Sequence, residues 1–410
     1  MHVPKVRLGK GAIGVAGVRV VGGGLALLSL VAGLHLLGAA HFGRSVVLLS
    51  AGMLLALPCT SSERLVLRLA SSGNQSTAER IVRSFSHYTR ALLVVGFGAS
   101  VALAAAHHAD WATPAAVALA AASTTEVALR QAHARAIGQL MWGQAPNEVF
   151  RPLMTIAGYA LAHYAPTDLR APIAVAVPSL LTLVLILFSP LAENRFDVSV
   201  GDEPRGLRHH IRPLIAFVVI STVAAGLERG YPIIVGSLAG DEEVALVAIG
   251  LRIMQVGLFG QALAIYYYSP PLARALKVDK HSSDAAGIIR RIRWISITLV
   301  IPAIALCWTA PGWLLTILGV SPDLEWALRV SALAIAAQLV TGPAQAALTM
   351  SDGESKVAIT YVIGISLGFI VYVATPGSGG LAALIAITSS YVVNAIGHAY
   401  YARRSFGRWA

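Results

Sequence analysis

The residues best placed to do chemistry are ionisable side chains that stand inside long apolar stretches. A charged side chain at the middle of a bilayer costs about 2.5–3.5 kcal/mol, so such residues are expected to face the protein interior or water. Arginine's planar fork matches phosphate oxygens bidentately. Four arginines against two glutamates therefore predict a basic cavity for an anionic head group. The predicted binding residues are Arg19, Arg130, Arg229 and Arg252, and the two carboxylates are Glu126 and Glu228.

The two glutamates have more than one interpretation. Glu126 and Arg130 are four residues apart, so they share one face of a helix and can pair. Such a pair could orient the arginine toward cargo, exchange a proton, or simply stabilise its helix. Glu228 stands beside Arg229, and both could lie at a membrane interface. Both glutamates are therefore predicted as ion-coupling or structural residues. Arg19 has the further alternative of snorkelling to an interface.

These residues must be positioned by membrane-spanning helices. The chain has 410 residues, of which 56% are hydrophobic and only 12% charged, about half the charged fraction of a soluble protein. Its apolar runs are long enough to cross a bilayer. The fold class predicted is an all-α integral membrane protein of about twelve helices. We expect spans at 12–38, 45–69, 88–108, 113–137, 148–166, 171–192, 212–238, 243–269, 294–318, 324–349, 355–375 and 378–402.

The loops differ in charge on the two sides of the predicted bundle. The longest loops, 70–87, 193–211 and 270–293, fall on one side together with most lysines and arginines. The positive-inside rule then places this side and both termini in the cytoplasm. The net charge of +11 is thus explained by topology. Nucleic acid is not expected as a partner, because the basic residues are spread over many loops. The run "YYYSPP" at 266–271 fits an interfacial aromatic belt.

One phrase occurs twice, about two hundred residues apart. In "LHLLGAAHFGRSVVLL" (34–49) and "IVGSLAGDEEVALVAI" (234–249), Gly38 aligns with Gly240. Two later pairs follow in the same order: 78–90 with 285–297, and the polar turns 139–149 with 347–357. A six-helix unit returns the chain to its starting side, so we expect two parallel repeats. The predicted domains are an N-terminal lobe (1–192), a cytoplasmic linker (193–211) and a C-terminal lobe (212–410).

Twelve spans in two sets of six, with "LHLLGAAHFGRSV" at the first hairpin, resemble the MOP exporter superfamily, and most closely its Wzx-type polysaccharide flippases. "NEVFRPLMTIAGYAL" (147–161) and "LERGYPIIVGSLAGDEEVALVAIGLRI" (227–253) resemble the family's fifth span and its span 7–8 segment. The chain departs from the usual pattern at His35, where arginine is common, at Arg44-Ser45 near the usual tyrosine, and at Ala245, where glycine is common.

The resemblance implies two six-helix bundles that form a V around a central cavity. It implies a flippase of the bacterial cytoplasmic (inner) membrane. The cargo would be a polyprenyl-pyrophosphate-linked oligosaccharide, a precursor of cell-surface polysaccharide, moved by alternating access. The partners implied are this lipid-linked glycan, the lipid bilayer and polysaccharide assembly enzymes.

Three rival functions remain open. A small-molecule exporter of the MATE branch usually has a carboxylate in the first span, but residues 11–40 contain no Asp or Glu. A lipid II flippase of the MurJ branch usually has two more spans. A membrane-bound glycosyltransferase or polymerase generally brings a large outer loop, whereas every predicted outer loop is short. No Walker-A loop and no metal-ligand spacing occurs. The chain is therefore predicted to be no enzyme and to need no cofactor or metal.

Overall fold

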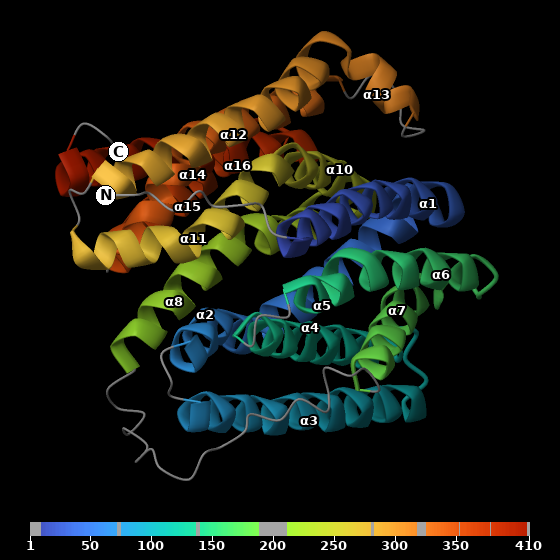
Figure 1. Ribbon diagram of the computed structural model, residues 1–410. Helices are drawn as coiled ribbons and strands as arrows, with labels where there is room; N and C mark the ends of the chain where they lie inside the picture. The colour runs from blue at the N-terminus through green and yellow to red at the C-terminus, as the bar shows by residue number, and fades with distance from the viewer. Residues whose placement is uncertain are drawn as a thin grey trace.

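The computed structural model describes residues 10–71, 75–136, 140–187, 211–279, 283–317, 325–351, 353–377 and 379–407. Within these ranges the regular structure is helical, as expected where a bilayer leaves backbone groups no water to bind (Figure 1). In the N-terminal half the elements are α1 (Lys10–Leu55), α2 (Leu57–Ser71), α3 (Gln75–Ala105), α4 (Thr113–Ala136), α5 (Leu140–Ala145), the π-helical η1 (Pro146–Phe150), α6 (Arg151–His163) and α7 (Arg170–Leu187). In the C-terminal half they are α8 (Ile211–Ala225), the π-helical η4 (Gly226–Gly230), α9 (Tyr231–Leu238), α10 (Asp241–Gly257), α11 (Phe259–Val278), α12 (Ser283–Thr309), α13 (Pro311–Ile317), α14 (Glu325–Met350), α15 (Glu354–Ala374) and α16 (Gly380–Phe406).

The duplicated glycines form the same turn. Gly38, inside α1, has φ 73° and ψ 164°, and Gly240, before α10, has φ 97° and ψ 167°. This conformation is accessible essentially only to glycine. The 46 residues of α1 would extend about 69 Å if straight, but a Cβ on Gly33 would touch the ring of Phe42, so the chain doubles back at Gly38. The predicted equivalence of the two hairpins is borne out in their backbone angles.

Seven of the described helices are long and apolar enough to cross a membrane, or eight if the pair α10 and α11, bent by 49°, is one span. One of the seven, Gly17–Leu55, contains the Gly38 turn and so holds most of the first predicted span and the first part of the second, which α2 continues. Other predicted spans are interrupted: 148–166 by η1 and 212–238 by η4. The helices follow the predicted order, and the predicted fold class is confirmed.

Three predicted loops need correction. The stretch 139–149 was predicted to be a polar turn, yet the chain is helical from Leu140 through α5, η1 and α6. The predicted loop 70–87 is helical from Gln75, and α11 and α12 reach well into the predicted loop 270–293. In each case polar residues continue a helix beyond its apolar part. The predicted linker 193–211 lies outside the described residues apart from Ile211.

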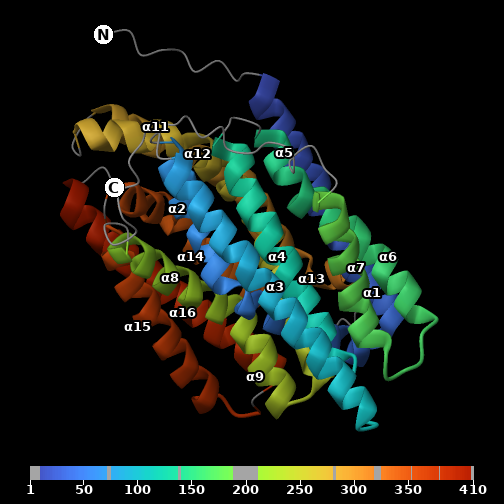
Figure 2. The ribbon, with the colours of Figure 1, turned by 90° about the horizontal axis from the view of Figure 1, so that it is seen from below.

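The two halves meet along α1 and α10. In Figure 1 the blue and green helices lie below and the orange and red helices above, with α1 and α10 between them. Apolar side chains of both halves form one buried cluster there, including Leu30, Phe42, Ala245 and Ile249. The α2 helix also packs against α8 (Figure 2). A site at this interface can therefore receive side chains from both halves.

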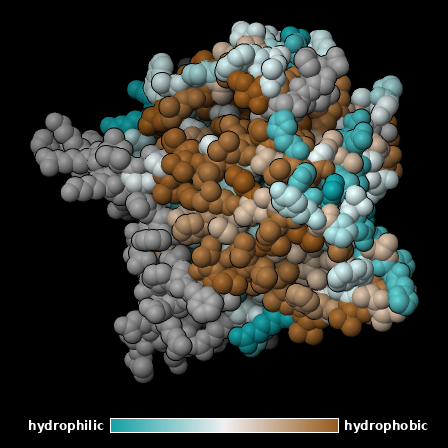
Figure 3. Space-filling view, turned by 90° about the vertical axis from the view of Figure 1, so that its right-hand side faces the viewer, coloured by the Kyte–Doolittle hydropathy of each residue, from teal (hydrophilic) through white to brown (hydrophobic). Residues whose placement is uncertain are grey.

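Polar contacts gather at the end of the bundle that holds the two glycine turns, which we call the hairpin end. Arg44 pairs with Asp110 in the loop between α3 and α4. A carboxylate oxygen of Glu243 accepts a hydrogen bond from the Gly380 amide at 2.6 Å, across the start of α16. These contacts join turns that alternating spans predict to lie on one side. Between the ends, the surface is largely apolar, as a lipid-facing belt requires (Figure 3).

The positive-inside rule gives a testable orientation. A cysteine at Ser199 is expected to resist an impermeant maleimide in intact cells and to react after permeabilisation, whereas a cysteine at Ala106, exposed at the hairpin end, should react from outside. The native Cys59 and Cys307 are 0% and 4% exposed, so we expect little background labelling from them. Labelling at Ser199 with protection at Ala106 would invert the topology.

Candidate functional site: a central arginine cluster

Two π-helical turns carry charged residues inward, one from each half. The turn η1 contains Glu148, and η4 contains Glu228 and Arg229. A π turn widens the helix by one residue and is frequent at functional sites. A Cβ on Gly22 would lie 2.6 Å from the carbonyl oxygen of Glu148, so this glycine lets α1 pack directly on η1. The small residue thus brings the first span next to the charged turn.

Four arginines form what we call the central arginine cluster: Arg19 of α1, Arg151 of α6, Arg229 of η4 and Arg252 of α10. All four are partly buried. Arg151 interacts electrostatically with both Arg229 and Arg252, and these two interact with each other. Three guanidinium groups from both halves therefore repel one another. Such a group is stable only if an anion or a carboxylate compensates it.

The carboxylates compensate this charge in part. Glu148 interacts with Arg19 and Arg252, while Glu228 faces Tyr391 of α16. Neutral groups accept the resolved hydrogen bonds: Arg252 donates to Gln255 at 3.1 Å. In the part of the chain that the structure describes, no carboxylate forms an ion pair with Arg151. The cluster therefore has a formal excess of positive charge.

Arg19 connects the two halves. Its Nε donates to the Gln144 side-chain oxygen of α5 at 2.6 Å. Its guanidinium carbon lies 5.0 Å from the ring centroid of Tyr266, on α11 in the other half. A cation over an aromatic face is attracted by the ring's electrons. Because both partners are protein groups, the Arg19 side chain points into the molecule. Its two contacts connect α1 with α5 and with α11.

The predicted pair on α4 is present. The Arg130 Nε lies 3.4 Å from a carboxylate oxygen of Glu126, and their side chains are 22% and 12% exposed. Glu126 also interacts with Cys59 of α2, within the same half. The contact between Arg130 and Glu126 is an ion pair between successive turns of the same helix. Of the six predicted residues, the structure therefore brings Arg19, Arg229 and Arg252 together, sets Glu228 beside them toward α16, and pairs Arg130 with Glu126.

Sequence reasoning missed Glu148, Arg151, Gln144 and Tyr266. The first three lie in or near the stretch 139–149, which was predicted to be a polar turn, so they were not considered as residues of the bundle interior. Because helix begins at Leu140, Glu148 and Arg151 lie about 12 Å and 16 Å along it. The sequence did hold a signal: Glu148 and Arg151 stand ten and seven residues before Gly158, in an otherwise apolar run. Tyr266 was assigned to the aromatic belt, whereas it lies under Arg19.

This arrangement is suited to binding, since it offers convergent cations from both halves. Guanidinium groups can bind phosphate oxygens bidentately and, being always charged, do not serve as acids or bases. Among the described residues, no group of three or more His, Cys, Asp or Glu could hold a metal ion. The cluster is therefore a candidate anion-binding site.

Comparison with known families and with curated proteins finds no match. Solved structures do match. A proline-to-alanine mutant of a MATE transporter has a TM-score of 0.66 at 14% identity, with 96% of this chain and 95% of that chain covered. The MATE multidrug transporter DinF-BH, solved as a complex, also has 0.66, at 15% identity, with 99% of each chain covered.

This chain has the MATE fold. The expected fold of about twelve helices in two six-helix lobes is confirmed. The neighbours are MATE transporters, and identities of 14–15% show the fold alone, so the resemblance to MOP exporters and to their Wzx branch stays a prediction. A third neighbour, a MOP superfamily transporter from Pyrococcus furiosus, has a TM-score of 0.60 at 14% identity over 97% of this chain and 94% of that one, and its description reports reverse polarity of its binding pocket and suggests a different function.

Proposed function

We propose that this protein is a membrane exporter that binds an anionic, phosphate-bearing cargo at the central arginine cluster. The observation that carries the proposal is the mutual approach of Arg151, Arg229 and Arg252 with too few carboxylates to balance them. A phosphate between them would relieve their repulsion and satisfy their N–H donors. The proposed role is transport, and no chemical conversion of the cargo is assigned.

The MATE fold supports transport by alternating access. In transporters built from two repeats, the substrate site lies between the repeats, and rocking of one against the other moves the opening from side to side. Arg19 and Arg151 come from the N-terminal half, while Arg229 and Arg252 come from the C-terminal half. A cargo held by both pairs would therefore sense any movement of one half relative to the other.

For the cargo we propose a polyprenyl-pyrophosphate-linked oligosaccharide, moved across a bacterial cytoplasmic membrane with both termini in the cytoplasm. Its pyrophosphate offers several charged oxygens to the arginines, and its polyprenyl tail can remain in the bilayer. The resemblance of the hairpin and span-five motifs to Wzx-type flippases supports this choice. Polysaccharide assembly enzymes would then supply and use the glycan. Glu126 and Glu228 are proposed as ion-coupling or structural residues.

A small-molecule exporter is the second candidate, favoured by the fold match to MATE transporters and by the multidrug description of DinF-BH. The excess of arginine in the cluster repels cations. If the cargo is a small molecule, we therefore expect an anionic amphiphile. The P. furiosus neighbour with a pocket of reverse polarity supports charge as the feature that separates the two candidates.

Proteoliposomes containing the full chain test these candidates directly. A fluorescent polyprenyl-pyrophosphate disaccharide is expected to move between leaflets faster than in empty vesicles, while the cationic dye ethidium should not be transported. The Arg130→Gln variant, which removes the ion pair with Glu126 on α4, should move the lipid at close to the wild-type rate. Transport of ethidium without movement of the lipid would overturn the proposed cargo and favour a cationic drug exporter.

A further inference from the structure

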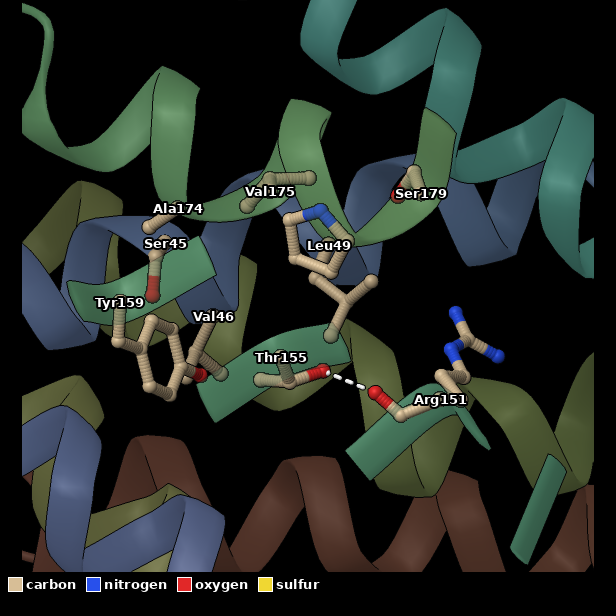
Figure 4. A pocket seen from close by; sticks show the side chains of 10 residues that line it. Ser45, Val46, Leu49, Arg151, Thr155, Tyr159, Ala174, Val175 and Ser179 are labelled. Carbon is tan, nitrogen blue, oxygen red and sulfur yellow. Dashed lines mark hydrogen bonds between the residues drawn. The ribbon is translucent and has the colours of Figure 1, made fainter. Parts of the chain in front are cut away.

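A small cavity lies beside Arg151 and is lined by residues of the N-terminal half alone. Three elements line it: the part of α1 after Gly38, α6 and α7 (Figure 4). Its volume is about 30 Å³, room for about two water molecules. A sugar or a lipid head group does not fit. The lining residues are Ser45, Val46, Leu49, Arg151, Thr155, Tyr159, Ala174, Val175, Pro178 and Ser179.

The polar groups of this cavity are one guanidinium and four hydroxyls, with no carboxylate among the ten lining residues. Two hydroxyl hydrogens are already used: Ser45 donates to the Phe42 carbonyl at 2.7 Å, and Thr155 donates to the Arg151 carbonyl at 2.8 Å (Figure 4). The Tyr159 hydroxyl lies near the Ser45 side chain. Ser45 and Thr155 therefore have no hydroxyl hydrogen left for a ligand.

Donor capacity remains on Arg151 and Ser179. Arg151 has five N–H donors and one resolved side-chain bond, from Nη2 to Thr124 at 3.0 Å. Ser179 is 5% exposed and has no hydrogen-bond partner within the described part of the chain. In Figure 4 the Arg151 side chain rises from α6 toward the side of the cavity where Ser179 lies on α7. Two donors thus border one small space.

We propose that this cavity binds one small monovalent inorganic anion, chloride in the cell, held by Arg151 and Ser179. The charge argument is that Arg151 faces two other arginines and has no carboxylate in ion-pair contact among the described residues. The size argument is the cavity volume, which admits a monatomic ion and excludes a phosphate ester. The bound anion partly offsets the charge of Arg151 and so lowers the repulsion between Arg151 and its neighbours Arg229 and Arg252.

Equilibrium dialysis of ³⁶Cl⁻ against the purified full chain tests this site, in gluconate buffer without any lipid-linked glycan. Wild type is expected to bind about one chloride per chain, saturably. Arg151→Gln should weaken binding at least tenfold, and Ser179→Ala severalfold. The control is Arg329→Gln, because Arg329 already pairs with Glu325 at 3.0 Å on α14 and should leave chloride binding unchanged.

Soaking a crystal of the wild-type protein in bromide locates the bound anion by its anomalous signal. This experiment tests the site even if the Arg151→Gln variant fails to fold. Anomalous signal between Arg151 and Ser179 supports the proposal. Three results would overturn the proposal and leave a cavity that holds only water. They are anomalous signal at Arg229 and Arg252 instead, no saturable chloride binding, and equal chloride binding by wild type and both cavity variants. Chloride binding that persists in a protein unable to flip the glycan would contradict the proposed function alone.

Discussion

Replacing Arg229 and Arg252 together by glutamine is expected to weaken binding of a polyprenyl-pyrophosphate glycan about 100-fold. A charge-assisted hydrogen bond contributes about 1.5–3 kcal/mol, so two lost contacts cost about 3 kcal/mol or more. Glutamine keeps a polar side chain of moderate length and removes the charge. Binding can be measured by fluorescence polarisation of the labelled lipid in detergent. The single variant Arg252→Lys should keep only part of the wild-type affinity, because lysine lacks the planar guanidinium that binds two phosphate oxygens at once.

The same double variant has a second expected signature. Arg151, Arg229 and Arg252 interact repulsively in the absence of cargo, so removing two of these charges should leave the thermal unfolding midpoint unchanged or raise it. Reduced binding with undiminished stability would distinguish a ligand site from a structural one. Arg130→Gln is the matched control, since Arg130 pairs with Glu126 on α4. Unchanged binding in the double variant would show that the cluster does not hold the cargo.

Gly43→Ala is expected to disrupt the contact between the two hairpin turns. A Cβ on Gly43 would overlap the backbone carbonyl of Asp241 in the other half. Backbone cannot give way as a flexible side chain can, so we expect a destabilisation of about 1–3 kcal/mol. Gly23→Ala is the control in the same helix: a Cβ there meets nothing within 4 Å, and alanine favours helix over glycine.

The effect on opening can be measured with a cysteine at Ala245, which is 3% exposed at the interface of the halves. Gly43→Ala should increase its maleimide labelling rate, and Gly23→Ala should not. Equal labelling in the two variants would mean that the hairpin contact does not hold this end closed. The Val47 side chain also lies 2.9 Å from the position of a Cβ on Gly236, so the hairpin contact extends beyond one residue.

The sequence by itself determined the fold class, the helix order and the doubled hairpin. Helices in a bilayer must be long and apolar, and this requirement is local, so it is visible in runs of hydrophobic residues. The turn at Gly38 and Gly240 was equally visible, because a backbone with positive φ and extended ψ needs glycine wherever it occurs. Arg19, Arg229 and Arg252 were recognised as candidates because charge inside an apolar run is rare.

Only the tertiary structure decided which charges meet. Arg130 and Arg252 look alike in sequence, yet Arg130 pairs within α4 while Arg252 interacts with arginines of two other elements, α6 and η4. Glu148 and Arg151 entered the site because helix continues back to Leu140 through a π turn. Their partners Arg229 and Arg252 are 78 or more residues away along the chain. Proximity over such distances depends on how α1, α6 and α10 pack, and the identity of each residue does not encode that packing.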